Sequence, residues 1–273
     1  MSASLSPCPR SVVVPRLRAA GCVFAEDEAR LLICAARTPA DLAAMVDRRA
    51  AGLPLEHVLG WAQFRGLRIA VDPAVFVPRR RTELLARQAI ALARQAAGPA
   101  GQARTRPRAV IVDLCCGSGA LVAALDGIEL YAVDIDPAAV RCARRNLAAT
   151  GAQVYEGDLD EPLPAALRGR VDVLVANAPY VPTAAVGLLP PEARLHEPRV
   201  ALDGGTDGLD VLRRVIAAAP GWLAPGGHLL VKTSQRQAPQ TVETFAGNGL
   251  IPRLARSEEH NATVVIGTRP PPE

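Results

Sequence analysis

Strand-like and helix-like patterns alternate along residues 109–266, and this alternation constrains the fold more than any other feature of the sequence. Short apolar runs are followed by segments whose apolar residues recur at helical spacing. Because successive parallel strands need a helical crossover, we expect a mostly parallel sheet with helices on both faces. The predicted strands are Ala109–Leu114, Leu130–Asp134, Gln153–Tyr155, Val171–Ala176, His228–Lys232 and Thr263–Ile266, and the predicted helices are Ala120–Leu125, Pro137–Ala149, Leu209–Ala219 and Pro239–Ala246.

The region before this alternation has a different pattern. Helical periodicity predicts a small bundle of about 55 residues, which would be only marginally stable in isolation. Strand-like spacing then predicts a hairpin that joins two domains. We expect helices over Glu26–Ala36, Thr38–Ala51 and Thr82–Ala97, a hairpin over 61–77, and an exposed loop rich in Gly, Pro and Arg over 98–108.

Composition narrows the class of protein. Of the 273 residues, 49 % are hydrophobic and 21 % are charged, which allows a sizeable buried core. No apolar run approaches the roughly 20 residues of a membrane span, and the first 18 residues lack the apolar region of an export signal. We therefore expect a cytoplasmic protein with reduced thiols. Six cysteines without a CxxC pair, and four histidines, argue against a metal site.

The charge is distributed unevenly. Residues 1–110 carry 17 basic and 8 acidic side chains, whereas residues 111–273 carry 14 and 19. A basic N-terminal region is compatible with RNA or an acidic partner, and equally with an ordinary solvated surface. Arginine is used throughout the chain, and Lys232 is the sole lysine among 31 basic residues, so the second interpretation is favoured.

A glycine-containing loop follows the strand predicted over 109–114. It reads Asp113-Leu114-Cys115-Cys116-Gly117-Ser118-Gly119. Gly117 and Gly119 permit tight turns and the close approach of a ligand, and the N-terminus of the next predicted helix offers free N–H groups. The dinucleotide fingerprint would need glycine at Val122, and the Gly-Lys-Ser/Thr of a P-loop is absent.

Acidic residues follow the next two strands. Asp134 can accept both hydroxyls of a ribose, and Asp158 can accept an adenine amine. Taken singly, Asp134 is equally explained as a helix cap and Asp158 as the end of a strand. Together with the glycine loop, on three successive strands, they favour S-adenosylmethionine as the cofactor.

The strand predicted over 171–176 runs into Asn177-Ala178-Pro179-Tyr180. A planar amide or exocyclic amine is a poor nucleophile because its lone pair is delocalised. The Asn177 side-chain oxygen and the Ala178 carbonyl can accept its two N–H hydrogens, which orients the nitrogen toward a methyl donor, and Tyr180 can stack on the planar group. A turn without function favours the same residue types, so this element carries weight only beside the cofactor loop.

These motifs resemble those of the HemK/PrmC protein-(glutamine-N5) methyltransferases. The similarity covers roughly residues 45–240 in the family's motif order. Its specific element is Pro78-Arg79-x-x-Thr82-Glu83, which adenine-N6 DNA methyltransferases would not be expected to carry. The matching segments are Gly52–Leu55, Leu59-Gly60, Phe64–Leu67, Val75–Arg79, Thr82-Glu83, Asp113–Gly119, Asp134, Gly157-Asp158, Asn177–Tyr180, Glu197-Pro198, Ala201–Gly205 and Asp207-Gly208.

The resemblance implies an α/β fold: a class I, Rossmann-like methyltransferase domain with a seven-stranded, mostly parallel sheet over 81–273. It also implies a small N-terminal helical domain for substrate recognition over 1–60 and a β-hairpin linker over 61–80. The implied reaction transfers a methyl group from S-adenosylmethionine to the side-chain amide nitrogen of a protein glutamine. That glutamine would lie in the Gly-Gly-Gln loop of a release factor or in another translation protein. We expect a monomer that requires neither membrane nor nucleic acid.

By position, the resemblance also implies the site residues. Phe76 should border the sulfonium methyl and the target amide, and the catalytic set is Phe76, Asn177, Ala178, Pro179 and Tyr180. The cofactor-binding set is Arg79, Thr82, Asp113, Cys115, Gly117, Gly119, Asp134, Asp158 and Asn177. No metal-binding residue is implied.

Three positions depart from the family pattern. Ala178 replaces a proline and Cys115 replaces a glycine, while Lys232 replaces a glutamate. A charge reversal near a site cannot be neutral if it is buried. Two alternatives therefore stay open. One is an adenine-N6-type nucleic-acid methyltransferase, against which an aromatic content of 3 % argues. The other is a cofactor-binding paralogue without catalysis.

Overall fold

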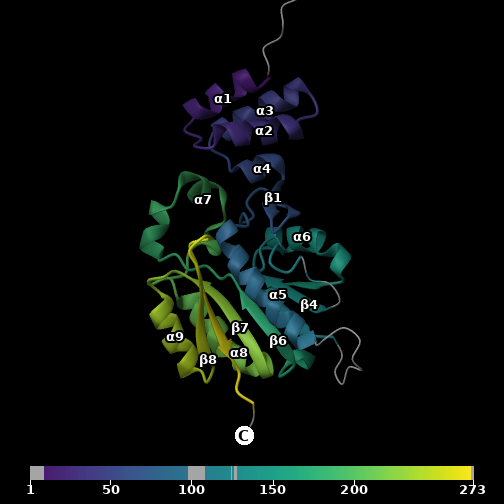
Figure 1. Cartoon of the computed structure of the whole chain (residues 1–273), viewed down its shortest axis with the longest axis vertical. Helices are drawn as coiled ribbons and strands as arrows, with labels where there is room; N and C mark the ends of the chain where they lie inside the picture. Colours follow the sequence, from purple (N-terminus) through teal and green to yellow (C-terminus); the bar gives the residue numbers. More distant parts are fainter. Residues whose placement is uncertain (1–8, 98–107, 124, 126–127, 272–273) are drawn as a thin grey trace, which may run out of the picture.

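The computed structural model describes residues 9–97, 108–123, 125 and 128–271. Helices of the N-terminal region lie at one end of the molecule, a β-hairpin follows, and a sheet flanked by helices makes up the rest (Figure 1). The loop predicted over 98–108 lies outside the described residues except for Arg108. Within those residues, no helix combines the length and apolar character needed to cross a membrane.

In the described part of the chain, seven strands form the main sheet in the order β5-β4-β3-β6-β7-β9-β8. Neighbouring strands are parallel from β5 to β7, and β9 pairs antiparallel with both β7 and β8. The predicted seven-stranded, mostly parallel sheet is therefore confirmed. The order reverses where the chain passes from β5 to β6, and ligands bind at such a switch point. The strands are β3 Val110–Leu114, β4 Glu129–Asp134, β5 Gln153–Glu156, β6 Val171–Ala176, β7 Leu223–Thr233, β8 Ile251–Ser257 and β9 Ala262–Thr268.

Apolar clusters cover both faces of the sheet. On one face, Leu85 and Ile90 of α5 (Glu83–Ala97) share a cluster with Ile111. On the other, Trp222 of α8 (Asp210–Trp222) and Phe245 of α9 (Ala238–Gly247) share a cluster with strand residues. Burial of each large side chain contributes about 2 kcal/mol to the stability of the fold, so the two helical layers hold the strands and their carboxyl ends in place. The remaining elements of this part are α6 Pro137–Asn146, α7 Pro191–His196, η1 Arg80–Thr82, η2 Ala148–Thr150, η3 Ala165–Leu167, η4 Thr183–Leu188 and η5 Arg199–Ala201.

The N-terminal helices have their own small apolar cluster. It includes Leu17 and Leu32, both fully buried, together with Val46. The third helix begins after Thr38, whose side chain accepts the N–H of Asp41. These helices are α1 Pro9–Ala19, α2 Ala25–Ala35, α3 Pro39–Ala50 and α4 Leu55–Leu59.

The hairpin of β1 (Trp61–Phe64) and β2 (Leu67–Ala70) is fastened to α6. The Asn146 side chain accepts the N–H of Ala70 at 2.9 Å and donates to the Ala70 carbonyl at 2.9 Å. The same amide donates to the Ser118 carbonyl at 2.8 Å. One side chain therefore ties the hairpin to the glycine loop.

Some local expectations are wrong. Residues 120–123 form turns instead of beginning the helix predicted over Ala120–Leu125, so within the described residues no helix N-terminus directly follows the glycine loop. The predictions also omitted α1 and β8. Helix α1 contains Pro15, and β8 alternates mostly exposed residues around Pro252, so neither segment has a strong apolar pattern.

Candidate active site

A cavity of about 190 Å³ lies at the carboxyl edge of β3, β4 and β6. The glycine loop, the segment before α5 and residues after β5 complete its wall. The structure thus brings together predicted residues from five separate parts of the sequence. Those that line the cavity are Phe76, Thr82, Cys115, Gly117, Asp134, Asp158, Asn177 and Pro179. The other predicted residues lie outside its lining in the described part of the chain: Arg79, Asp113, Gly119, Ala178 and Tyr180.

The glycine loop turns through left-handed backbone conformations. Cys115, Gly117 and Gly119 have φ values of 56°, 54° and 76°. A Cβ on Gly117 would meet nothing within 4 Å, whereas one on Gly119 would come within 3.0 Å of the Leu147 side chain. Gly119 is therefore required for packing against Leu147. At Gly117, the lack of a side chain leaves the backbone accessible to a ligand. Cys115 adopts this conformation at a cost of about 1–2 kcal/mol. Burial raises the pKa of its thiol, so Cys115 is not a nucleophile at neutral pH.

Asp113 is fully buried at the end of β3, and neither of its carboxylate oxygens has a hydrogen-bond partner among the described residues. Burial raises the pKa of this carboxyl, and the nearby charge of Asp134 raises it further. Such a group needs a cation or donor to be stable as a carboxylate.

Asp134 is positioned by backbone groups. One oxygen accepts the N–H of Gly117 at 2.8 Å and the other accepts the N–H of Asp136 at 2.9 Å. Burial raises its pKa, and these hydrogen bonds oppose that shift. The cap of α6 is Asp136, so the helix-cap explanation for Asp134 is wrong. Each Asp134 oxygen keeps a further lone pair for a donor in the cavity. Asp158 also lines the cavity and pairs with Arg214 at 2.8 Å.

Asn177 lines the cavity and carries an unpaired acceptor. Its Oδ1 atom is buried and has no hydrogen-bond partner within the described structure, and the residue lines the cavity wall. The next residue, Ala178, is 1 % exposed, so the backbone at this point is firmly enclosed. An acceptor left unpaired in a dry site costs stability unless a ligand donates to it.

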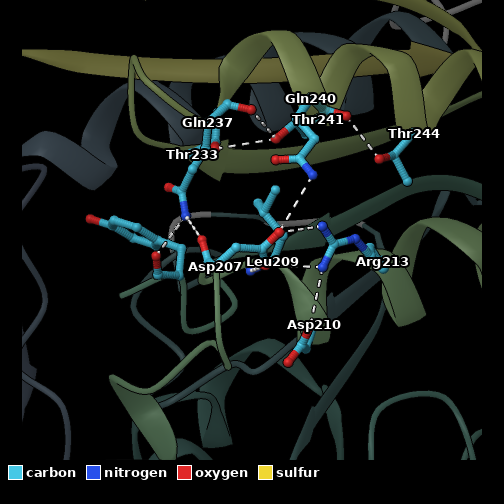
Figure 2. Close-up of polar contacts among 10 residues, drawn as sticks. Asp207, Leu209, Asp210, Arg213, Thr233, Gln237, Gln240, Thr241 and Thr244 are labelled. Carbon is cyan, nitrogen blue, oxygen red and sulfur yellow. Dashed lines mark hydrogen bonds and ion pairs between the residues drawn. The ribbon is translucent and has the colours of Figure 1, made fainter. Parts of the chain in front are cut away.

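Gln237 and residues 202–208 support the backbone of the turn after Asn177. The sequence analysis did not assign this role to them. Gln237 donates from Nε2 to the carbonyl of Tyr180 at 2.9 Å and to that of Asp207 at 3.0 Å. Figure 2 shows Gln237 directed at Asp207, and Arg213 between Asp207 and Asp210. The hydrogen bond from Arg213 lowers the pKa of Asp207 to about 2.

Two glycines within residues 202–208 allow this segment to pack closely against the turn after Asn177. A Cβ on Gly204 would lie 2.7 Å from the Pro179 carbonyl oxygen, and one on Gly208 would lie 2.4 Å from that of Tyr180. Backbone hydrogen bonds join Val181 to Leu202 and Gly204. Residues 202–208 thus form a backbone support for the Asn177–Tyr180 element, which we call the bracing segment.

Phe76 and Arg79 belong to the segment that precedes α5. The Arg79 guanidinium is stacked 5.3 Å from the Phe76 ring centroid and pairs with the buried Glu197. Glu197 also accepts the N–H of Val77 at 3.1 Å. Burial raises the pKa of Glu197, although Arg79 opposes the shift. Arg79 therefore holds the Phe76 ring and is directed at Glu197.

Lys232 lies behind the cavity wall, at the end of β7. It is 3 % exposed, its Nζ donates to the Thr82 hydroxyl at 3.2 Å, and it lies 5.1 Å from the Tyr180 ring centroid. No ion pair joins it to a carboxylate of the described residues. Burial lowers the pKa of Lys232 to about 7, and the charges of Arg81 and Arg79 act in the same direction.

Replacing Lys232 by Met is expected to stabilise the fold, most strongly at low pH. The unfolded lysine has a pKa near 10.5 and the folded one near 7, so between these values the unfolded chain binds more protons. The stability of the native chain therefore rises with pH over that window, and the burden of the buried charge is greatest below pH 7. Thermal unfolding at pH 6 should show a gain of roughly 3 kcal/mol that shrinks toward pH 10. A gain that does not depend on pH would contradict this assignment.

The fold and the cavity at its switch point define a class I methyltransferase. Residues 111–189 match a family model described as a methyltransferase domain. The fold is similar to a methyltransferase from Pyrococcus furiosus (TM-score 0.53, 14 % identity, 76 % of this chain and 91 % of that one). It is also similar to a ribosomal protein L11 methylase from Lactobacillus delbrueckii subsp. bulgaricus (TM-score 0.50, 18 % identity, 74 % and 85 %).

Curated sequences identify the family. A release factor glutamine methyltransferase of Geobacter sulfurreducens is 37 % identical over 85 % of this chain and 79 % of its own length. One from Mycolicibacterium smegmatis is 40 % identical over 82 % and 78 %, respectively. The chain belongs to the release factor glutamine methyltransferase family, and the resemblance seen in its motifs is confirmed.

Proposed function

We propose that this protein transfers a methyl group from S-adenosylmethionine to the side-chain amide nitrogen of the glutamine in the Gly-Gly-Gln loop of a peptide-chain release factor. The observation that carries the proposal is the buried, unpaired Oδ1 of Asn177 at the cavity wall. The names of the relatives support this choice of substrate. The proposed site of action is the cytoplasm, with the protein acting as a monomer.

The polar groups of the cavity fit the proposed cofactor. Asp134 and Asp158 offer acceptors for ribose hydroxyls and an adenine amine, and the open backbone at Gly117 leaves room beside them. Asp113 lies just outside the cavity lining as a buried acid without a hydrogen-bond partner among the described residues, and the ammonium group of the cofactor's amino-acid tail would stabilise its charged form. When bound, S-adenosylmethionine supplies an electrophilic methyl group.

The chain's own groups orient the nucleophile. Asn177 Oδ1 and the Ala178 carbonyl accept the two amide hydrogens of the target glutamine, which fixes the nitrogen and directs its lone pair. Phe76, held by Arg79, and Pro179 exclude water from the reacting atoms. Tyr180 stacks on the planar amide. These acceptors interact more strongly with the amide as positive charge develops on its nitrogen.

We further propose residues 1–60 as a substrate-recognition domain, 61–80 as its linker and 81–273 as the methyltransferase domain. Arg49 of α3 pairs with Glu28 of α2 and with Glu192 of α7, so the N-terminal helices are fastened near a segment that reaches the cavity wall. Val23 and Phe24, which precede α2, are 84 % and 70 % exposed. Exposed apolar side chains of this kind suit contact with a protein substrate.

The test uses the full chain, methyl-labelled S-adenosylmethionine and a purified release factor from cells that lack this enzyme. Peptide mass spectrometry should find one methyl group on the loop glutamine. A release factor with that glutamine replaced by alanine is the matched control and should stay unlabelled. Label on nucleic acid from the same cells would support the adenine alternative, and cofactor binding without label would support a non-catalytic paralogue.

A further inference from the structure

Lys232 is a buried cationic side chain without a matching anion. The described residues give its Nζ one hydroxyl and one aromatic ring, and the nearby charges of Arg79 and Arg81 are of the same sign. Arg79 is paired with Glu197, but no carboxylate in the described part of the chain pairs with Lys232. An ammonium in this state is costly, and an anion that arrives with a ligand would remove the cost.

The sheet order relates Lys232 to the proposed ribose acceptor, Asp134. Asp134 ends β4 and Lys232 is near the end of β7, with β3 and β6 between them. Three strand spacings make this separation about 14 Å. The ends of the two intervening strands carry Asp113 and Asn177. If the ribose of a nucleoside binds at Asp134, a tail that runs along these strand ends extends toward Lys232.

Thr82 connects Lys232 to the cavity. Its hydroxyl accepts the hydrogen bond from Nζ, and the residue itself lines the cavity wall. Because that hydroxyl receives a hydrogen bond from a cation, its own hydrogen is free to be donated into the cavity. The amino-acid tail of the proposed cofactor carries one anion, its α-carboxylate.

We infer that Lys232, acting through Thr82, is a positioning residue that holds the α-carboxylate of the methyl donor's amino-acid tail. This inference rests on the proposed function. Asp113, near the end of β3, is a buried acid that needs a positively charged partner when ionised. The ammonium of the same tail would supply that charge. The site then matches a zwitterion with a cation at one strand end and an anion at another.

Protonation of Lys232 is linked to this binding. An anion favours the charged amine, so binding raises the depressed pKa of Lys232, and at pH 8 the protein takes up protons as the ligand binds. Affinity for a ligand with the carboxylate should fall as the pH rises from 6.5 to 8.5, by roughly tenfold. The variant Lys232→Met keeps the other charged or titratable groups of this region: Arg79, Arg81, Glu83, Asp113, Tyr180, Glu197 and His260. A pH dependence caused by those groups would survive in it.

The experiment is calorimetric titration of the full chain with S-adenosylhomocysteine and with its decarboxylated analogue, which keeps the ammonium. At pH 6.5, Lys232→Met should bind S-adenosylhomocysteine about tenfold more weakly than the native chain, and the analogue within twofold of it. At pH 8, proton uptake on binding S-adenosylhomocysteine, measured in buffers of different ionisation enthalpy, should be lost in the variant. Lys232→Arg should restore part of the affinity. The control variant Arg87→Met, which removes an exposed charge from α5, should leave the affinity for both ligands unchanged.

The outcomes separate the inference from the proposed function. Equal loss for both ligands, or no loss for either, overturns the role of Lys232 while cofactor binding by the native chain stands. If the native chain binds neither ligand, the proposed function itself fails. Thr82→Val provides a second variant should Lys232→Met not fold, and it should lose affinity for S-adenosylhomocysteine more than for the analogue.

Discussion

Replacing Asn177 by alanine is expected to lower kcat for methyl transfer by about 10³-fold. The substitution removes the buried Oδ1 atom, which has no partner in the described structure and which we propose as an acceptor for the target amide. Without it, one amide hydrogen has no acceptor, and the nitrogen is free to rotate away from the methyl group. The affinity for S-adenosylhomocysteine should change by less than about tenfold, because cofactor contacts are spread over several residues.

Single-turnover kinetics on the release factor, with peptide mass spectrometry as the readout, measures this loss separately from binding. Asn248→Ala is a matched control. That asparagine follows α9 and donates to the carbonyl of Thr244, away from the cavity lining, so kcat should not change. If Asn177→Ala kept kcat within threefold of the native value, the proposed role of Asn177 in orienting the target amide would be wrong.

The gathering of the strand-end residues could be predicted from the sequence. Gly117, Asp134 and Asn177 each follow a short apolar run, and parallel strands place their carboxyl ends along one edge of the sheet. The structure brings these residues to one cavity. The prediction needed only the strand periods and the direction of the chain, which are local properties.

Features set by distant contacts could not be predicted. Residues 120–125 have enough apolar character for a helix, but the segment is too short for its periodicity to distinguish a helix from the turns that residues 120–123 form. Lys232 was recognised as unusual, yet its partner Thr82 lies 150 residues away in the chain. Gln237 and the bracing segment act on backbone atoms, and a sequence pattern does not show which carbonyl a distant amide will reach.

Replacing Gly208 by alanine should lower kcat by about 10²-fold with little change in cofactor affinity. The residue has a φ of 79°, and a Cβ there would lie 2.4 Å from the Tyr180 carbonyl oxygen and 2.6 Å from Gln237 Nε2. Backbone atoms cannot yield as a flexible side chain does, so the bracing segment and the Asn177–Tyr180 element must move apart. A displacement on the order of 1 Å at a reacting group is enough for this loss of rate.

The control variant Gly226→Ala distinguishes the effect of displacing the Asn177–Tyr180 element from the effect of backbone strain alone. Gly226 has a nearly equal φ of 77°, but a Cβ there would meet nothing within 4 Å, and it lies in β7 far from the carboxyl edge. Both variants should lose about 1 kcal/mol of unfolding free energy from the left-handed conformation, measured by denaturant titration, and Gly208→Ala should lose more because its Cβ also clashes with backbone. Only Gly208→Ala should also have a lower kcat, because only its Cβ contacts the backbone of the Asn177–Tyr180 element. Equal kcat for the two variants would show that the bracing segment does not position Asn177 and Tyr180.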